Sequence, residues 1–467
     1  MWFRWAILTG VLFLSACASD AGLAPQSHIV NVNPPTDWEI DTQWWQQFHD
    51  AQLNGLMKTA LHNSPDIAMI EARIRQAHNE TQLAKDQLKA SYNIDGSAVR
   101  EKFSAQGYFP PPIGGSTFNL GQITPDFYYD LDWWGKHRAV NQASLGTMAA
   151  ANAEAQAARL ALSISLAQHY FSLQADDERL SRVKQMLITR HTLLGLLREQ
   201  ANAGLASNRE IYPAGGAIAD LEREQSALAQ REHLDRIAIA ALMGQTPENG
   251  DHITIAPLTP ALTLPNQVPA DLIGMRPDIT AKRANIQVAL AQSALAKIQF
   301  YPDINLSGFF GFQSIGFSNL LQSNSEMASF GPAIHLPIFN RDTLRATLGA
   351  KYAEYDMAVE SYNQSIFEAM RQAAAALSSL HAVADQENSQ QQLIHTLERS
   401  QDLASLRYQS GLQNDLPALN AALAVQTAEQ TRTGLAQQNL NASLALIEAL
   451  GGLPRPISDG KNNDNAK

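Results

Sequence analysis

The sequence predicts an α+β membrane protein in which one structural plan occurs twice, with long coiled-coil helices and four membrane-spanning strands in each chain. Three observations predict this fold. Two halves of the chain match each other at a nearly constant offset. Two long stretches lack proline and carry helix-forming composition, and shorter stretches before them alternate apolar and polar side chains.

The first 16 residues have the pattern of a secretory signal, which ends in Leu-Ser-Ala directly before Cys17. Arg4 supplies a positive charge, and residues 5–14 form an apolar run that is too short to remain as a spanning helix. An ordinary signal peptide with an incidental cysteine is one interpretation. We favour the other, because the sequence resembles the lipobox of bacterial lipoproteins, which implies cleavage before Cys17 and acylation of that residue. Ala18, where aspartate would favour the inner membrane, favours delivery to the outer membrane.

Composition argues against several functions. Cys17 is the only cysteine, so there is no disulfide framework and no thiolate metal site. The net charge is −11 and the basic residues are scattered, which argues against nucleic acid as a partner. The sequence lacks the common catalytic and nucleotide-binding motifs, so we expect no enzyme and no cofactor. The acidic residues 176–178 are interpreted as a solvated helix face rather than a metal site.

The duplication is clearest near the end of each half. Residues 204–247 align with residues 411–454 without a gap, and eleven of these 44 positions are identical. Earlier in each half, Pro-Asp-Ile occurs at 65–67 and again at 277–279. The predicted segments are a signal peptide (1–16), an N-terminal anchor with a Trp-rich segment (17–64), the first repeat (65–246), a Pro-rich linker (247–276), the second repeat (277–454) and a disordered tail (455–467).

Two stretches without proline, residues 138–203 and 341–410, predict the long helices. At 1.5 Å per residue, each would extend for roughly 100 Å. The second stretch carries apolar side chains at spacings of mostly four and three, which is typical of a helix that packs lengthwise on another helix. This stripe consists of Leu344, Leu348, Tyr352, Tyr355, Val359, Tyr362, Ile366, Ala369, Ala373, Ala376, Leu380 and Val383. The pattern alone leaves a plain coiled-coil rod open as an alternative.

The alternating stretches favour a membrane protein over a rod. Alternation is clear in residues 304–313, 330–338 and 126–133, and it is weaker in residues 92–99. Strands of about ten residues with one apolar and one polar face are typical of transmembrane β-barrels. Four strands are too few to close a barrel, and an open edge inside lipid leaves backbone groups unpaired. The sequence therefore predicts that copies of this chain associate.

Several short motifs along the whole mature chain resemble the outer-membrane factors of the TolC superfamily. The similarity is greatest to the lipidated branch typified by OprM and NodT, and it extends to the MdtP type. The motifs are the lipobox, Trp-Trp-Gln-Gln-Phe-His-Asp at 44–50 with Leu53 and Leu56, Arg-Pro-Asp-Ile at 276–279, Phe-Tyr-Pro at 300–302, Gly-Pro at 331–332 with Leu-Pro-Ile-Phe at 336–339, and Gly-Leu at 204 and 411.

The resemblance implies a homotrimer with a twelve-stranded β-barrel in the outer membrane, continuous with a helical barrel in the periplasm. It implies three kinds of partner, namely a periplasmic adaptor protein, an inner-membrane pump and outer-membrane lipid. The implied function is the exit duct of a tripartite efflux system that passes small toxic compounds to the exterior. A duct for protein export and a non-conducting lipoprotein scaffold remain open as alternatives.

The resemblance also assigns roles to the two Gly-Leu turns. Tyr408 matches a gate tyrosine of the family, whereas the family's two gate aspartates are replaced here by Pro417 and Asn420. The expected periplasmic gate is therefore Tyr408, Asn414, Asp415 and Asn420. The expected adaptor-docking residues are Gly204, Leu205, Ser207, Gly411 and Leu412, and both glycines are expected to have positive φ. Glu210 is the acidic residue of the first turn. Ordinary turn and capping chemistry is the alternative interpretation of all these residues.

Overall fold

The computed structural model describes residues 20–32, 35, 37–205, 207–262, 264, 269–336 and 340–456. The chain divides into two compact units. Unit 1 consists of Met1–Ile29, Ile74–Ala151 and Lys282–Tyr362, and unit 2 consists of Val30–Arg73, Asn152–Ala281 and Asn363–Lys467. Each unit contains segments from both sequence repeats, so the two repeats are interleaved rather than folded as separate domains.

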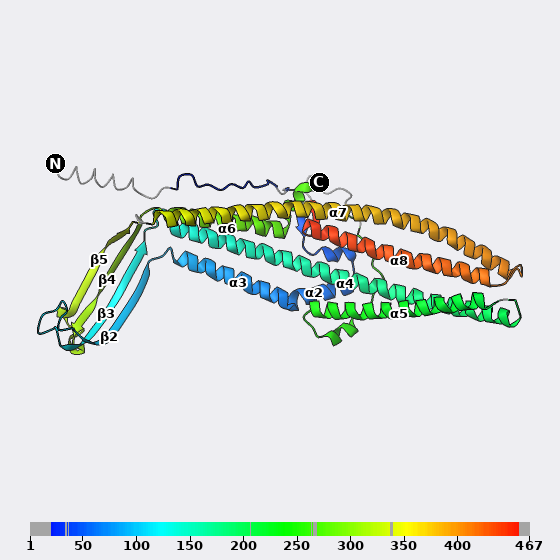
Figure 1. Ribbon diagram of the computed structural model, residues 1–467, viewed down its shortest axis with the longest axis horizontal. Helices are drawn as coiled ribbons and strands as arrows, with labels where there is room; N and C mark the ends of the chain where they lie inside the picture. The colour runs from blue at the N-terminus through cyan, green and yellow to red at the C-terminus, as the bar shows by residue number, and fades with distance from the viewer. Residues whose placement is uncertain are drawn as a thin grey trace, which may run out of the picture. The chain divides into compact units, whose positions relative to one another are not determined.

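A four-stranded antiparallel sheet belongs to unit 1 (Figure 1). Its strands are β2 (Ser91–Lys102), β3 (Thr117–Asp130), β4 (Asp303–Ile315) and β5 (Glu326–His335), which pair in chain order. The register places Tyr92 beside Phe127, and Phe127 beside Gly308. Because side chains alternate along a strand, these residues lie on one face, and Asp126 lies on the other. The first face is apolar and open, since Tyr92 is 75% and Phe330 is 73% exposed.

The predicted strands overlap the observed ones, and the largest difference lies around β3. The alternation predicted a strand over residues 126–133, whereas β3 begins at Thr117 and ends at Asp130. Asp132 has a φ of 46°, a left-handed conformation that no strand contains, so the alternation beyond Asp130 belongs to a turn. The first part of β3 was missed because Pro125 lies within it, and proline is rarely found in an inner strand. The last three residues of the predicted stretch 330–338 are Leu336, which follows β5, and residues 337–338, which lie outside the described residues.

Helices complete unit 1. They are α6 (Pro277–Ile298) from Lys282 onward, the second half of α3 (Pro65–Asp86), and the beginnings of α4 (Lys136–Asn202) and α7 (Arg341–Gln409). Phe300, Ala296 and Leu348 form a small apolar core with Leu23 from the extended N-terminal segment packed against it. This N-terminal segment is therefore docked to the helices of unit 1.

Unit 2 is helical and has the larger apolar core. It contains α2 (Ala51–Asn63), α5 (Asn208–Leu242), α8 (Leu416–Leu450) and the remaining parts of α4 and α7. A short 3-10 helix, η1 (Trp44–Phe48), places the fully buried Trp44 in this core. Asp50 begins α2 by accepting two backbone N–H bonds, and it also accepts a hydrogen bond of 2.8 Å from the Tyr170 hydroxyl. Burial and the neighbouring Asp50 carboxylate raise the pKa of Tyr170.

A two-stranded sheet in unit 2 was not predicted from the sequence. β1 (Trp38–Asp41) pairs antiparallel with β6 (Leu453–Pro456), so the N-terminal segment meets the end of the second repeat. Short 3-10 helices also occur at Pro247–His252 and Ala270–Met275, inside the segment interpreted as an extended linker.

The helix lengths confirm the internal duplication. α3 and α6 both have 22 residues, α5 and α8 both have 35, and the long helices α4 and α7 have 67 and 69. The apolar stripe of α7 is also confirmed, because Leu348, Val359 and Ile366 are fully buried and the other members are buried or half-buried. Within the described part of the chain, no helix has the combined length and apolar character that crossing a membrane requires.

Candidate functional site

The two Gly-Leu turns have the same backbone geometry. Gly204 follows α4 with a φ of 75°, and Gly411 follows α7 with a φ of 72°. In each turn the glycine N–H donates to the carbonyl three residues earlier, and the leucine N–H donates to the carbonyl five residues earlier, at 2.8–2.9 Å. This pattern is a Schellman motif, in which glycine avoids the steric cost of a left-handed conformation. The predicted positive φ is confirmed at both positions.

The leucines of these turns are exposed. Leu205 is 80% and Leu412 is 77% exposed, although an apolar residue at this place in a Schellman motif commonly packs back onto its own helix. Two exposed leucines at equivalent positions therefore provide apolar contact area at the turns of both hairpins.

The helices that follow the turns begin differently. Ser207 precedes α5, and its backbone N–H donates to the Glu210 carboxylate at 2.8 Å, as in a capping box. Asp415 precedes α8, but its side chain makes no capping hydrogen bond. The Glu210 carboxylate of the first turn therefore caps α5, whereas the half-buried Asp415 carboxylate of the second turn makes no capping hydrogen bond to α8.

The expected gate residues lie close together along the chain. Tyr408 belongs to the last turn of α7 and is 47% exposed. Asn414 is exposed in the turn, and Asn420 is exposed on the second turn of α8. Pro417 occupies the first turn of α8, where its missing N–H interrupts no helical hydrogen bond. The chain thus places three polar side chains and one carboxyl group near one turn.

An apolar layer connects the first hairpin to the start of α8. Leu194 and Leu197 of α4 and Ile218 of α5 are buried together with Leu423 of α8. Leu416 and Leu419, in the first turns of α8, pack against the same cluster. The turn of the second repeat is therefore supported by the hairpin of the first.

A row of polar contacts continues along α4 and α8. The pairs are Ser172 with Gln437 at 3.3 Å, Glu178 with Thr433 at 3.1 Å, Arg182 with Glu429 at 3.3 Å, and Thr189 with Gln426 at 3.3 Å. The partners ascend in one helix as they descend in the other, so the helices are antiparallel. Sequence reasoning missed this row, because each partner lies in a different repeat and neither has a local signal.

The acidic run at 176–178 is only partly the solvated face that was expected. Asp176 is 2% exposed and pairs with Arg231 of α5 at 2.9 Å, and with Arg179 at 3.4 Å. The hydrogen bond that Arg231 donates to Asp176 raises the pKa of its guanidinium. Gly434 of α8 leaves room for Arg179, since a β-carbon there would lie 2.7 Å from the guanidinium. The interpretation failed at Asp176 because the charge that neutralises it is 55 residues away in sequence.

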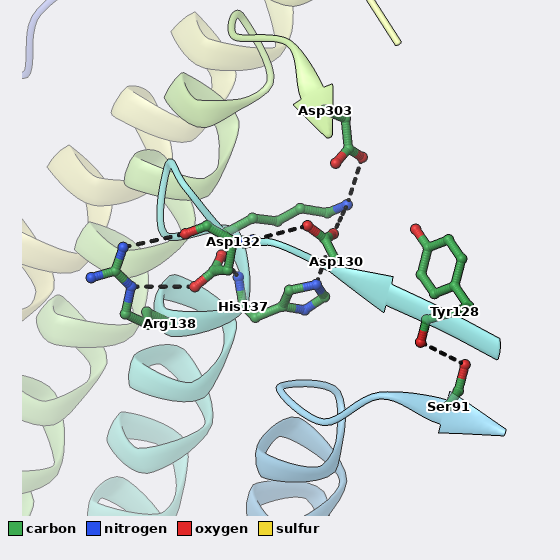
Figure 2. A network of polar contacts seen from close by, with 8 residues as sticks. Ser91, Tyr128, Asp130, Asp132, His137, Arg138 and Asp303 are labelled. Atoms are coloured by element: carbon green, nitrogen blue, oxygen red, sulfur yellow. Dashed lines mark hydrogen bonds and ion pairs between the residues drawn. The ribbon is translucent and has the colours of Figure 1, made fainter. Parts of the chain in front are cut away.

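A second polar network lies in unit 1, where β3 ends and α4 begins (Figure 2). Lys136 lies 3.0 Å from Asp303 of β4 and 3.4 Å from Asp130 of β3, and His137 Nε2 lies 2.8 Å from Asp130. Burial opposes the charge of Lys136, but Asp303 and Asp130 outweigh this effect and raise the pKa of its ammonium group. These contacts join two strands to the first residues of α4.

Asp132 shapes the same junction through its backbone and side chain. Its carboxylate accepts the backbone N–H of His137 at 2.9 Å and the Arg138 Nε–H at 3.2 Å (Figure 2). A carboxylate that accepts the first N–H groups of a helix fixes where the helix starts. In the part of the chain that the structure describes, no cluster of three or more histidine, cysteine, aspartate and glutamate residues has the arrangement of a metal site.

Comparison with known families identifies what these turns and helices belong to. The sequence model of the family described as Outer membrane efflux protein matches residues 56–245 and 268–452. This chain belongs to the outer membrane efflux protein family. The match covers both turns and both sets of repeat helices, and it confirms the expected location in the outer membrane and the expected role in efflux.

Individual relatives agree with the family. The chain is 28% identical over 443 residues to the multidrug resistance outer membrane protein MdtP of Escherichia coli K12, covering 92% of this chain and 89% of that protein. It is 28% identical over 431 residues to MdtQ of Escherichia coli O157:H7, covering 88% of each. The solved structure of VceC from Vibrio cholerae matches with a TM-score of 0.80 and 33% identity, over 89% of this chain and 99% of that one. The CmeC channel of Campylobacter jejuni, 20% identical, matches with a TM-score of 0.81 over 95% and 96%.

These comparisons confirm the predicted fold. Long helices, a four-stranded sheet and two repeated halves are shared by this outer membrane efflux protein and the solved members that it matches.

Proposed function

We propose that this outer membrane efflux protein is, as a homotrimer, the exit duct of a multidrug efflux system. In this proposal a periplasmic adaptor and an inner-membrane pump deliver small toxic compounds, which the duct passes to the exterior. MdtP and MdtQ are multidrug resistance outer membrane proteins, and the similarity to them supports this choice of cargo.

The observation that carries the proposal is the four-stranded sheet of unit 1. Its exposed apolar face suits lipid, and its polar face suits a water-filled lumen. β2 and β5 form the two edges of this sheet, and unpaired strand edges are costly inside a bilayer. Three copies joined edge to edge would supply twelve strands and leave no edge. Trp133 and Trp134, 66% and 45% exposed just after β3, suit the membrane–water interface.

In the same proposal the two turns of unit 2 form the periplasmic end of the duct. Tyr408, Asn414, Asp415 and Asn420 would form the closed gate. Leu205 and Leu412 would provide apolar contacts for the adaptor, with Gly204 and Gly411 making the turns and Ser207 in the polar rim. The exposure of both leucines and the absence of a capping bond from Asp415 support these assignments.

We further propose that Cys17, which lies outside the described residues, carries a lipid anchor. The segment that follows it is docked in unit 1, the unit that contains the sheet. Asp20 lies 2.8 Å from Lys297 at the end of α6, and two consecutive backbone N–H groups, of residues 26 and 27, donate to Asp356 of α7 at 2.9 and 3.0 Å. A tether held in this way would keep the anchor with the membrane-facing unit.

Two measurements test the proposed function. The purified full-length chain, inserted into a planar lipid bilayer, should conduct ions. Expression in a bacterial host that lacks its own exit duct, together with an adaptor and a pump, should restore resistance to small toxic compounds. A chain that inserts as a trimer but neither conducts nor restores resistance would contradict the proposal and favour a structural scaffold.

The Cys17→Ser variant tests the anchor separately. We expect it to lose labelling by radioactive fatty acid and to keep its trimer in detergent, because the sheet inserts through its own apolar face. Ala16→Gly is a suitable control, since it keeps a small residue before the cysteine. Fatty-acid labelling that persists in Cys17→Ser would exclude this residue as the acylation site.

A further inference from the structure

Charged residues are segregated between the two faces of the four-stranded sheet. Among the residues of these described strands, only Arg100 and Lys102 are lysine or arginine, and both belong to β2. Alternation along β2 places them on the same face as Tyr92, which is the apolar face. Of the six acidic residues in the strands, only Glu326 of β5 shares this face. The other five, on the polar face, are Asp95, Glu101, Asp126, Asp130 and Asp303.

Arg100 and Lys102 lie near the end of the sheet that is remote from the helices. β2 follows α3 and β3 leads into α4, so the loop 103–116 adjoins the other end of these strands. In the proposed duct the helices are periplasmic, and this loop faces the exterior. Arg100 pairs with Asn119, which is ten residues from Tyr129 along β3. At about 3.3 Å per residue and a tilt of about 40°, this is a height of roughly 25 Å, equal to the apolar band of a transmembrane sheet. Arg100 therefore lies at the outer edge of that band.

Neither cation is neutralised within the described part of the chain. Both side chains are exposed, and neither forms an ion pair or a hydrogen bond with another described residue. Glu326 belongs to β5, which is at the opposite edge of the sheet from β2. Lys136, near the other end of the strands, is a contrast, because it lies between Asp303 and Asp130. Arginine and lysine at the edge of an apolar surface extend their charged groups toward the polar layer.

An apolar hollow lies on the same face as the two cations. Its volume is about 850 Å³, and Ile94, Phe127, Phe310 and Phe330 are among the residues that line it. Gly308 belongs to the lining, and a β-carbon there would lie 2.8 Å from the Phe330 ring. Glycine therefore makes room for one of the rings that form the hollow.

Small residues connect the cations to this hollow. Between Arg100 and Ile94, β2 presents only Ala98 and Gly96 on the apolar face, and a β-carbon on Gly96 would meet nothing within 4 Å. With the same rise and tilt, the six residues from Arg100 to Ile94 correspond to roughly 15 Å of depth, which is half of a hydrocarbon core of about 30 Å. A lipid of one leaflet with its headgroup at Arg100 would thus have its acyl chain end in the hollow.

We propose that this part of the apolar face, from Arg100 and Lys102 to the hollow, binds a phosphorylated and acylated lipid of the outer leaflet. This is the chemistry of the lipid A part of lipopolysaccharide. The guanidinium and ammonium groups donate charge-assisted hydrogen bonds to phosphate, and the acyl chains cover Ala98, Gly96 and the hollow. Charge complementarity favours this occupant over a zwitterionic phospholipid. The inference rests on the proposed function, which places this face in the membrane with its loop end outward.

Lipid binding by the purified full-length trimer in non-ionic detergent tests the site, with native mass spectrometry as the measurement. The wild type should bind bisphosphorylated lipid A roughly tenfold more tightly than lipid A without its phosphates. Arg100→Gln/Lys102→Gln should lose this preference, because glutamine removes the charge and keeps a polar side chain. Lys184→Gln/Arg198→Gln is the matched control, since it removes the same charges from exposed positions of α4. It should keep the preference.

Other ligands separate the contributions of phosphate and acyl chains. Inorganic phosphate should not displace lipid A, because it lacks the apolar area that the hollow contacts. Phosphatidylethanolamine should bind equally to the wild type and to Arg100→Gln/Lys102→Gln. Displacement by inorganic phosphate would overturn the lipid site and indicate a simple anion site. Equal affinity of the wild type for phosphorylated and dephosphorylated lipid A, or an unchanged preference in the double variant, would also overturn it.

An ion pair between two copies is the competing explanation of the cations, because β2 and β5 are the edges that join in the proposed trimer. Arg100 or Lys102 of one copy would then meet the Glu326 carboxylate of the next. We expect Arg100→Gln/Lys102→Gln and Glu326→Gln to keep the thermal midpoint of the lipid-free trimer. A matching fall in both variants would overturn the lipid site in favour of this ion pair.

Conductance separates this inference from the proposed function. In a planar bilayer, Arg100→Gln/Lys102→Gln should conduct as the wild type does, because both cations lie on the face away from the lumen. Altered ion selectivity in this variant would place the cations in the lumen and overturn the lipid site. A wild type that does not conduct would contradict the proposed function, whereas the comparison of lipids in detergent would still decide on the site.

Discussion

The turns of the two repeats have the same backbone conformation but differ in the side chains that surround it. Gly204 and Gly411 have φ values within a few degrees of each other and the same pair of hydrogen bonds. Beyond them, the first repeat uses a capping box at Ser207 and Glu210 and a proline inside α5. The second repeat has an Asp415 without a capping bond, a proline in the first turn, and an unbroken α8.

The difference indicates what each part of the hairpin is needed for. A helix end must satisfy its last carbonyl groups, and a left-handed glycine does this in the same way in any sequence. The side chains beside the turn have no such requirement, so they were free to diverge after duplication. The backbone of the turns therefore reflects a requirement that all helix ends share, and the side chains beside it are where the two repeats differ.

The largest effect is expected when both exposed leucines become charged. The Leu205→Asp/Leu412→Asp variant should lose drug resistance by at least about tenfold, because an unpaired carboxylate in an apolar contact costs more than 1.4 kcal/mol. Each single variant should lose part of this resistance if both turns contact the adaptor. The thermal midpoint of the purified trimer should not change, since both side chains are solvated. Full resistance in the double variant would place docking elsewhere.

The next effect concerns how each hairpin is held together. Asp176 pairs with Arg231 across the first hairpin and is almost fully buried, whereas Glu387 accepts a hydrogen bond of 2.9 Å from Asn439 across the second. Asp176→Ala should lower the free energy of unfolding by about 2–4 kcal/mol, because Arg179 would lose its buried partner. Glu387→Ala should cost less than about 1 kcal/mol, since its carboxylate is half-buried. Thermal melting of the two variants in detergent checks which of them loses more stability, and equal midpoints would contradict the expected difference.

The difference between local backbone requirements and contacts of distant side chains also explains how much of the structure could be predicted from the sequence. Patterns that repeat locally were sufficient for the long helices, the glycine turns and three of the four strands, because each depends on periodicity or on a backbone requirement. The prediction failed around Pro125 because this residue pairs with β2 but lies where the pairing of β3 with β4 is interrupted, and a proline is tolerated at such an irregularity. The partner of Asp176 and the row of contacts between α4 and α8 have no local signature. They arise only when distant segments are packed together.

A smaller effect is expected from the acidic residue of each turn. Asp415→Asn should reduce the cation selectivity of the duct by a few-fold and weaken block by divalent ions, since like charges at about 6 Å repel by roughly 1–3 kcal/mol at an effective dielectric constant of 20–80. Glu210→Gln should leave selectivity unchanged, because Glu210 is engaged in capping α5. Reversal potentials in asymmetric salt distinguish the two variants. If Asp415→Asn keeps full selectivity, Asp415 has no part in the gate, and closure depends on Tyr408 and the asparagines.

The smallest effect concerns the Pro-Asp start of each repeat, where the two halves again differ in one side chain. Arg276 donates two hydrogen bonds to Asp278, at 3.0 and 2.8 Å, and a third to the Ala449 carbonyl at the end of α8. In the first repeat, the residue two positions before Asp66 is Ser64. Burial opposes the charge of Asp278, but the guanidinium of Arg276 outweighs it and lowers the pKa of this carboxyl below its usual 3.8.

A lowered carboxyl pKa stabilises the folded chain at pH values above the pKa of the unfolded state, and this contribution disappears as the pH falls through the folded-state pKa. The wild type should therefore exceed Asp278→Asn in stability between pH 5 and 7, and the difference should vanish between about pH 4 and pH 2. We expect less than about 1 kcal/mol, because the Asp278 side chain is 45% exposed and solvent screens the pair. Asp66→Asn is the matched control and should show no such difference, since no arginine stands two residues before it. Thermal midpoints measured across this pH range for the three proteins decide the matter. A difference between wild type and Asp278→Asn that persists undiminished at pH 2 would mean that Asp278 acts through its shape and hydrogen bonds rather than through its charge.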